Sequence, residues 1–206
     1  MEQGSPEWFA ARLGKVTASK IADVCAKTAS GWGASRANYA AQLICERLTG
    51  ETAGSFSNAA MQWGTDTEPQ ARAAYEFLTN REVIEIAMVQ HPSIKMSSAS
   101  PDGLVSGDGM VEIKCPASAT HINTLMKEKI PGKYILQMQW QMACAERLWS
   151  DFVSFDPRLP IELQMWVQRV PRDDDKIAEL EQIVREFLAE IDATVETLRT
   201  KYMDAA

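Results

Sequence analysis

Residues 100–116 read S-P-D-G-L-V-S-G-D-G-M-V-E-I-K-C-P, and the rest of the fold is expected to be built around them. Residues 101–103 and 107–109 are turn sequences, the second being the Gly-Asp-Gly signal of a tight hairpin. Residues 110–115 have the composition of a short strand, which Pro116 ends. The stretch therefore predicts a β-hairpin.

Alternation along the second strand separates its side chains onto two faces. Val111 and Ile113 are expected to point into a core. Glu112 and Lys114 share the opposite face, with their positions about 7 Å apart. The turn back through the first strand can bring Asp102 opposite that face. Two carboxylates and one ammonium are therefore predicted to converge.

Such a group has the chemistry for phosphodiester hydrolysis. Carboxylate oxygens are the hard ligands that Mg²⁺ and Mn²⁺ prefer, and a bound divalent ion keeps waters that can be activated. A lysine can orient or deprotonate the attacking water or neutralise charge on phosphorus. The alternative is an exposed Glu-x-Lys pair worth well under ~1 kcal/mol. Asp102 and the flanking apolar residues favour the metal interpretation over that alternative.

Four motifs in order resemble a known nuclease superfamily. Pro101-Asp102 with Glu112-Ile113-Lys114 resembles the PD-(D/E)xK pattern. R-L-G-K-V-T-A-S at 12–19 and W-G-T-D-T-E at 63–68 extend the likeness to its phage lambda exonuclease branch, the YqaJ-type viral recombinase family. The resemblance covers residues 5 to 160, approximately.

The resemblance implies an α/β (α+β) fold, with a restriction-endonuclease-like mixed central β-sheet flanked by helices in a single domain of residues 1–206. Residues 1–50 would form a helical 5′-end-binding region and residues 83–170 the catalytic sheet core. The residue patterns also predict a short helix that opens at Ser5, helices over residues 36–49 and 118–129, a loop over residues 51–58, and strands over residues 83–90 and 95–99 that join the hairpin in one sheet. Residues 173–202 carry apolar side chains at helical spacing beside an acidic face, which predicts an amphipathic helix covering the sheet or lying at a subunit boundary.

Family roles map onto the catalytic motifs residue by residue. Asp102 and Glu112 would hold Mg²⁺ together with the backbone carbonyl of Ile113, and Lys114 would serve the attacking water. Glu68 would complete a second metal site, so two Mg²⁺ ions are expected, for which Mn²⁺ can substitute. The alternative for Glu68 is an acid favoured by a helix dipole.

Gln137 would touch the catalytic region from an x-Q-x-Q helix at residues 133–147, the alternative being a surface glutamine.

A second set of residues is implied for the DNA end. Arg12 and Ser19 would contact the 5′-phosphate, since residues 19–27 are expected to form a helix whose positive end faces that anion. The alternative is a helix cap beside a surface arginine. Trp8 and Ser100 are assigned to the same DNA-binding set, and Met61 to an apolar wedge that parts the duplex.

The charge distribution reconciles an acidic chain with a polyanionic substrate. Net charge is −7, yet from Asp173 onward there are ten acidic and four basic residues. The first fifty residues carry six basic and four acidic side chains, so a local basic surface is possible. In the loop expected at residues 28–34, Trp32 could stack on a base or pack against the core.

The leading hypothesis is a metal-dependent 5′ to 3′ exonuclease that degrades one strand of linear double-stranded DNA to mononucleotides. It would leave 3′ overhangs for phage-type homologous recombination. The resemblance implies double-stranded DNA ends, a homotrimeric ring and a single-strand annealing recombinase as partners. Two alternatives stay open: an endonuclease of restriction or junction-resolving type on the same fold, and a non-cutting DNA-binding recombination adaptor.

The chain has neither a basic-plus-apolar leader nor a run of 18 apolar residues, so a soluble cytoplasmic protein of a bacterial or phage-infected cell is expected. Four scattered cysteines without a C-x-x-C pair predict reduced thiols and no iron-sulfur cluster. The chain departs from the lambda pattern at His91-Pro92, where the lambda enzyme has an additional acid.

Overall fold

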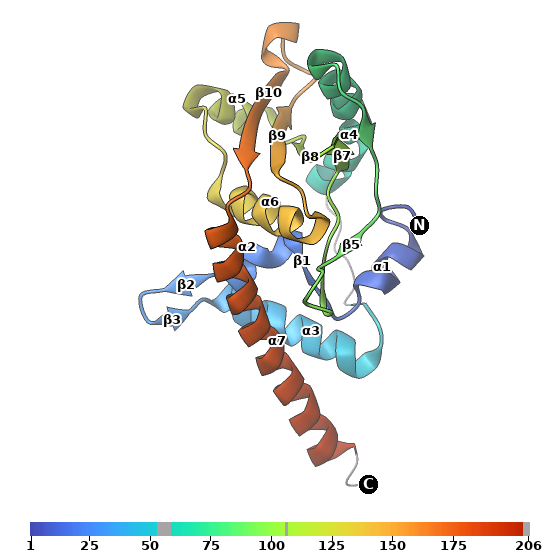
Figure 1. The fold of residues 1–206 in the computed structure, drawn as a ribbon, viewed down its shortest axis with the longest axis vertical. Coiled ribbons are helices and arrows are strands. Elements are labelled where there is room, and N and C mark those ends of the chain that lie inside the picture. The colour runs from blue at the N-terminus through green and yellow to red at the C-terminus, as the bar shows by residue number, and fades with distance from the viewer. Residues whose placement is uncertain (53–58, 106, 204–206) are drawn as a thin grey trace.

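The strand that carries Glu112 and Lys114 is the middle strand of a five-stranded mixed sheet (Figure 1). The computed structural model describes residues 1–52, 59–105 and 107–203. In spatial order the strands are β10 (Met165–Pro171), β9 (Trp149–Phe155), β8 (Gly109–Lys114), β7 (Gly103–Val105) and β4 (Val83–Ile84). β8 pairs parallel to β9, and the other neighbours are antiparallel. The predicted mixed central sheet is confirmed.

The β7–β8 hairpin forms as predicted, and two glycines explain its shape. Gly107 has φ +71°, a left-handed conformation that side chains other than glycine rarely adopt. A Cβ added to Gly103 would lie 2.1 Å from Val83 Cγ1, so the close approach of β4 requires glycine there. The chain therefore turns sharply and returns Asp102 toward β8.

Both faces of β8 are covered by helices. Val111 and Ile113 pack in one apolar cluster against α4 (Ala59–Thr79), as expected. The face bearing Glu112 is covered too, because Met110 packs there against α6 (Gly132–Ala145). The alternative of an exposed Glu-x-Lys pair is therefore wrong, because Glu112 is buried.

A second, smaller sheet takes strands that were expected in the first. Its order is β1 (Val16–Thr17), β6 (Ser97–Ala99) and β5 (Val89–Gln90). The continuous strand expected over residues 83–90 is wrong, because the chain breaks between β4 and β5 and each half pairs in a different sheet.

Two other local expectations near the N-terminus are corrected. The helix expected over residues 19–27 is only the 3₁₀ turn Ala18–Lys20 followed by the four-residue α2 (Ile21–Val24). The plain loop expected over residues 28–34 is wrong, because most of this segment belongs to a hairpin. The hairpin consists of β2 (Lys27–Thr28) and β3 (Gly31–Trp32). The loop expected over residues 51–58 lies mostly outside the described residues.

The remaining helices follow their predicted positions within a few residues. They are α1 (Pro6–Arg12), α3 (Ala34–Thr49), α5 (Ser118–Lys127) and α7 (Asp174–Tyr202), with a 3₁₀ turn at Ile161–Leu163. Within the described ranges, no helix has the length and apolarity that crossing a bilayer requires.

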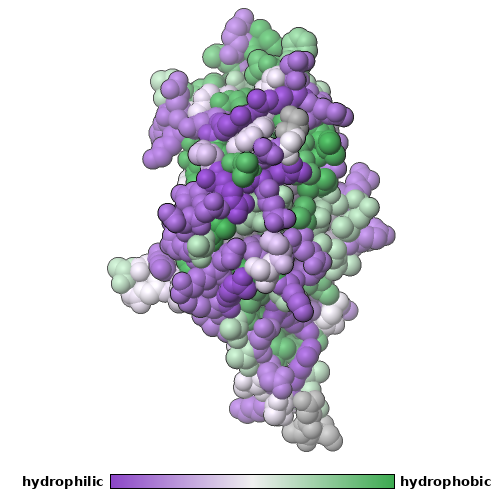
Figure 2. All heavy atoms as spheres, viewed as in Figure 1, coloured by the Kyte–Doolittle hydropathy of each residue, from purple (hydrophilic) through white to green (hydrophobic). Residues whose placement is uncertain are grey.

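α7 buries its apolar stripe against α2, α3 and α6 rather than on the main sheet. Its C-terminal part extends away from the rest of the chain (Figure 1). Figure 2 shows mostly hydrophilic side chains over the middle of the face in view, with hydrophobic ones concentrated toward the end opposite the C-terminus.

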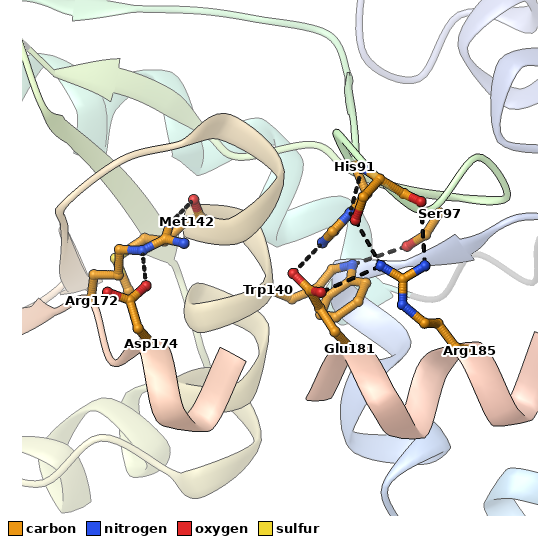
Figure 3. A network of polar contacts seen from close by, with 9 residues as sticks. His91, Ser97, Trp140, Met142, Arg172, Asp174, Glu181 and Arg185 are labelled. Atoms are coloured by element: carbon orange, nitrogen blue, oxygen red, sulfur yellow. Dashed lines mark hydrogen bonds and ion pairs between the residues drawn. The ribbon is translucent and has the colours of Figure 1, made fainter. Parts of the chain in front are cut away.

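A polar network attaches α7 to the smaller sheet (Figure 3). The His91 ring stacks on Trp140 with centroids 4.9 Å apart, and its Nε2 lies 3.3 Å from Glu181 Oε1. Arg185 Nη2 donates to Ser93 Oγ at 2.7 Å. His91 is buried, so the network links α6, α7 and the β5–β6 turn inside the molecule.

Protonation of His91 should destabilise this junction. Burial lowers the pKa of His91 below its ordinary value of 6.5, although Glu181 opposes the shift. The unfolded chain therefore takes up the proton first, and stability is lost as pH falls through about 6.5. The free energy of unfolding, measured by urea titration between about pH 7.5 and 5.5, should fall more steeply in wild type than in His91→Phe. Parallel slopes would contradict this assignment.

Candidate active site

Asp102 lies opposite Glu112 because of where the β7–β8 ladder ends. The last pair is Gly103 with Val111, so Asp102 is one residue beyond the ladder. Its Oδ2 accepts a hydrogen bond from the Ile113 backbone N–H at 2.6 Å. The carboxylate thus takes the amide that the ladder leaves unpaired, as the hairpin geometry predicted.

Glu112 is fully buried and receives three donors. Gln137 Nε2 donates to Oε1 at 2.6 Å, and Gln141 Nε2 donates to Oε2 at 2.6 Å. Lys114 forms an ion pair with Oε1. The contact expected for Gln137 is present, while the sequence prediction missed the role of Gln141. Its signal was available, since residues four apart share one helix face.

Lys114 is held as a cation. Burial by itself would lower the pKa of Lys114, but the Glu112 and Asp102 carboxylates outweigh burial and raise the pKa above its ordinary value. Its Nζ also lies 5.5 Å from the centroid of the Tyr134 ring. In this arrangement the charged side chain can donate hydrogen bonds and neutralise negative charge.

The three predicted acids influence one another electrostatically. Burial and then Glu112 raise the pKa of Asp102 well above its usual range, with a further contribution from Glu68. Burial also raises the pKa of Glu68, against the opposing effect of Arg72, whose Nη2 donates to Glu68 Oε1 at 2.7 Å. Like charges this close favour either protonation or a bound cation.

The donor set matches a divalent cation in chemistry but is not arranged as a ready metal cluster. Across residues 1–52, 59–105 and 107–203, no three His, Cys, Asp or Glu side chains converge closely enough to hold one ion. Glu112 is engaged by its donors and Glu68 by Arg72. The oxygens of Asp102, Glu112 and the Ile113 carbonyl are the hard ligands that Mg²⁺ takes.

Four of the five residues predicted for the DNA end line one cleft, and Ser100 is not among its lining residues. The cleft has a volume of about 1100 Å³, and its walls include Trp8, Arg12, Ser19, Met61 and Glu68. Glu68 therefore connects this cleft with the acid cluster. Ser19 is exposed there, although the long helix expected to make its anion site is absent from this part of the structure.

Arg12 is fixed at the cleft by Trp8 and Ser100. Its guanidinium carbon lies 3.9 Å from the centre of the Trp8 ring, and Nη1 donates to Ser100 Oγ at 3.2 Å. Trp8 Nε1 donates to the same oxygen at 3.0 Å. Burial lowers the pKa of Arg12, and within the described residues no carboxylate forms a salt bridge with it. Arg12 is thus a partly desolvated cation available to an anion.

The contacts of Gln3 and Trp32 are also defined by the structure. Gln3 Nε2 donates to the carbonyls of Ile86 and Pro101, at 2.9 and 3.0 Å, and so supports the turn before Asp102. Nothing in the sequence pattern indicated this contact. Trp32 is 42% exposed, with Arg36 4.0 Å from its ring centroid, so it packs on a cation rather than into the core.

The chain is similar to a known protein family and to proteins of known structure. Residues 7–148 match the YqaJ-like viral recombinase domain. LHK-Exo, in its crystal structure in complex with dAMP, is 52% identical in sequence to this chain. The two structures have a TM-score of 0.93 over 98% of this chain and 100% of that one. A crystal structure of the alkaline exonuclease LHK-Exo from Laribacter hongkongensis gives 52% identity and a TM-score of 0.92 with the same coverage.

A phage related exonuclease from Haemophilus somnus 129PT is 16% identical, with a TM-score of 0.74 over 89% of this chain and 96% of that one, which shows a shared fold. No match is found among curated proteins.

Removing the charge of Glu112 should lower the pKa of Asp102. Glu112 is the largest charge that raises this pKa, so Glu112→Gln relieves part of the repulsion. Carbon-detected NMR titration of the Asp102 carboxyl should show the shift. Asp156, whose pKa Arg158 holds at about 2, is the internal control and should not move. An unchanged Asp102 titration would mean that the two carboxylates are not coupled.

Proposed function

Because the chain belongs to the YqaJ-like viral recombinase family, we propose that it is a phage-type exonuclease that degrades one strand of linear duplex DNA in the 5′ to 3′ direction. The observation that carries the proposal is the group formed by the buried Glu112 with the half-buried Asp102 and Lys114, together with the cleft that holds Arg12 and is lined by Glu68. Its relative at 52% identity is an alkaline exonuclease.

Metal dependence rests on the donor set. Asp102, Glu112 and the Ile113 carbonyl would hold one Mg²⁺, with Glu68 contributing to a second. When bound, Mg²⁺ supplies a Lewis acid and lowers the pKa of coordinated water. Oε1 of Glu112 already accepts from Gln137 and pairs with Lys114, so Glu112 would coordinate the ion through Oε2, which accepts from Gln141 alone.

Lys114 acts on the phosphate in this proposal. Its raised pKa keeps the ammonium charged at neutral pH, so it stabilises negative charge that develops on phosphorus. The hydrogen bonds from Gln137 and Gln141 keep Glu112 in place beside it. The group therefore combines fixed carboxylates with a fixed cation around the scissile linkage.

End selection is assigned to the cleft. Arg12 and Ser19 would contact a terminal 5′-phosphate, with Ser100 and Trp8 orienting the guanidinium. Met61 lies on the wall of the same cleft and would part the duplex. Release of mononucleotides and 3′ overhangs follows from attack next to a held 5′ end.

The wider role is part of the same proposal. A homotrimeric ring would enclose the duplex, and a single-strand annealing recombinase would receive the exposed strand in the cytoplasm. The family's description as a viral recombinase domain supports a role in recombination.

The deciding experiment compares substrates. End-labelled linear duplex with a 5′-phosphate should release labelled mononucleotides in Mg²⁺ and stop releasing them in EDTA, while a closed circle should survive. Cutting of the circle would favour the endonuclease alternative. Binding without Mg²⁺-dependent release would favour the non-cutting adaptor.

Lys114→Met should lower the rate of nucleotide release by roughly 10²–10³-fold, the usual cost of removing one group that stabilises developing negative charge. The matched control is Lys133→Met, because Lys133 lies 4.8 Å from the centroid of the same Tyr134 ring but does not contact Glu112 or Asp102. Single-turnover measurements separate the chemical step from release. A fully active Lys114→Met enzyme would remove the lysine from the mechanism.

Arg12→Ala should abolish the preference for 5′-phosphorylated over 5′-hydroxyl ends. The ratio of kcat/KM for the two ends should drop by at least ~10-fold, since a charge-assisted hydrogen bond contributes about 1.5–3 kcal/mol. Lys20→Ala is the control, as Lys20 lines the same cleft but pairs with Asp23. An equal drop in both variants would indicate a general electrostatic effect and not end recognition.

A further inference from the structure

The side-chain amide of Gln141 is buried, and among the described residues only its nitrogen takes part in a hydrogen bond. It lies in the middle of α6, is fully buried and donates from Nε2 to Glu112 Oε2. Its Oε1 is also buried and has no hydrogen-bond partner in the part of the chain that the structure describes. Buried polar atoms are nearly always paired, and an apolar side chain would fill the same position without leaving an oxygen unpaired. The bond to Glu112 is therefore what this glutamine provides.

The orientation of the Gln141 amide follows from the charge that it faces. A carboxylate accepts hydrogen bonds only, so the amide must present its N–H₂ to Glu112 and its oxygen to the other side. The Gln141 Nε2 lies 2.6 Å from Glu112 Oε2. Gln141 thus restricts the orientation of the Glu112 carboxylate.

The distribution of donors gives Gln141 a role different from that of Gln137. A carboxylate has about four lone-pair sites. Gln137 and Lys114 both bind Oε1, while Gln141 binds Oε2. The lone pair that these contacts leave is on Oε2, and its direction is fixed by the bond from Gln141.

We propose that Gln141 is a positioning residue that aims the remaining lone pair of Glu112 Oε2 at the divalent cation. This inference rests on the proposed function, because it assigns a purpose to a contact within that same site. Gln141 acts through Glu112 and contacts neither DNA nor the reacting atoms. Its loss should weaken cation binding and the chemical step without weakening DNA binding.

The chain provides a matched control two residues away. Gln139 is in the same helix and is also buried, but Nε2 donates to the Pro171 carbonyl at 2.9 Å and Oε1 accepts from the Asp173 N–H at 2.9 Å. Its contacts fix the start of α7 and do not involve Glu112. Gln139→Met therefore removes two buried hydrogen bonds from α6 while leaving the carboxylate untouched.

The test compares wild type, Gln141→Met and Gln139→Met, with Gln141→Asn as a second variant that keeps an amide but is one methylene too short. Mn²⁺ binding to the free protein is measured by calorimetry, and kcat and KM on linear duplex are measured in Mg²⁺. Both Gln141 variants should bind Mn²⁺ about 10–100-fold more weakly and lose kcat by a similar factor, with KM unchanged. Gln139→Met should lower the Tm but keep wild-type Mn²⁺ affinity and kcat.

The possible failures can be told apart. If wild type neither binds Mn²⁺ nor degrades linear duplex, the proposed function fails, and this inference fails with it. If wild type does both and the Gln141 variants match it, the positioning role alone is overturned. Loss of both properties in Gln139→Met as well would show that any defect in α6 has this effect, which also overturns the assignment.

Discussion

The burial of Glu112 is the constraint on which the rest of the site depends. Moving a carboxylate out of water costs several kcal/mol unless charged and polar partners compensate. β8 is the middle strand of the sheet and helices cover both of its faces, so its side chains have little access to solvent. The compensation comes from two sources, Lys114 on the same strand and the amides of α6. Placing α6 over this face is therefore both a packing requirement and an electrostatic one.

Local patterns predicted most of what local chemistry controls. The hairpin, the alternation along β8 and the long stripe of α7 follow from turn residues and periodicity, and each is present. The break between β4 and β5 was not predictable in this way, because an apolar Val- and Ile-rich run looks the same whichever sheet each half joins. The four-residue α2 is a similar case, since tertiary packing of Ile21 and Val24 overrides helix propensity. Gln141 was missed because its role depends on which helix covers β8.

Some basic side chains of the first fifty residues form ion pairs with acidic side chains of α7. The basic excess of the first fifty residues suggested a DNA-facing surface, but α7 neutralises part of it. Arg36 donates to both carboxylate oxygens of Glu190, and Arg47 pairs with Asp192. The acidic face of α7 is thus not only solvated, because some of its acids hold α3. Arg12 is left as a cation of the cleft, which concentrates the attraction for an anion at one place.

Residues 100–102 contact both Arg12 and strand β8. Ser100 accepts hydrogen bonds from Arg12 and Trp8, and two residues later Asp102 accepts from the Ile113 N–H. Two residues of chain span at most ~7 Å, so the group that orients Arg12 is tied covalently to Asp102. Gln3 supports the Pro101 carbonyl between them. In the proposed exonuclease, this fixed separation is what would set the cut one nucleotide from the held end, because neither part can move without the other.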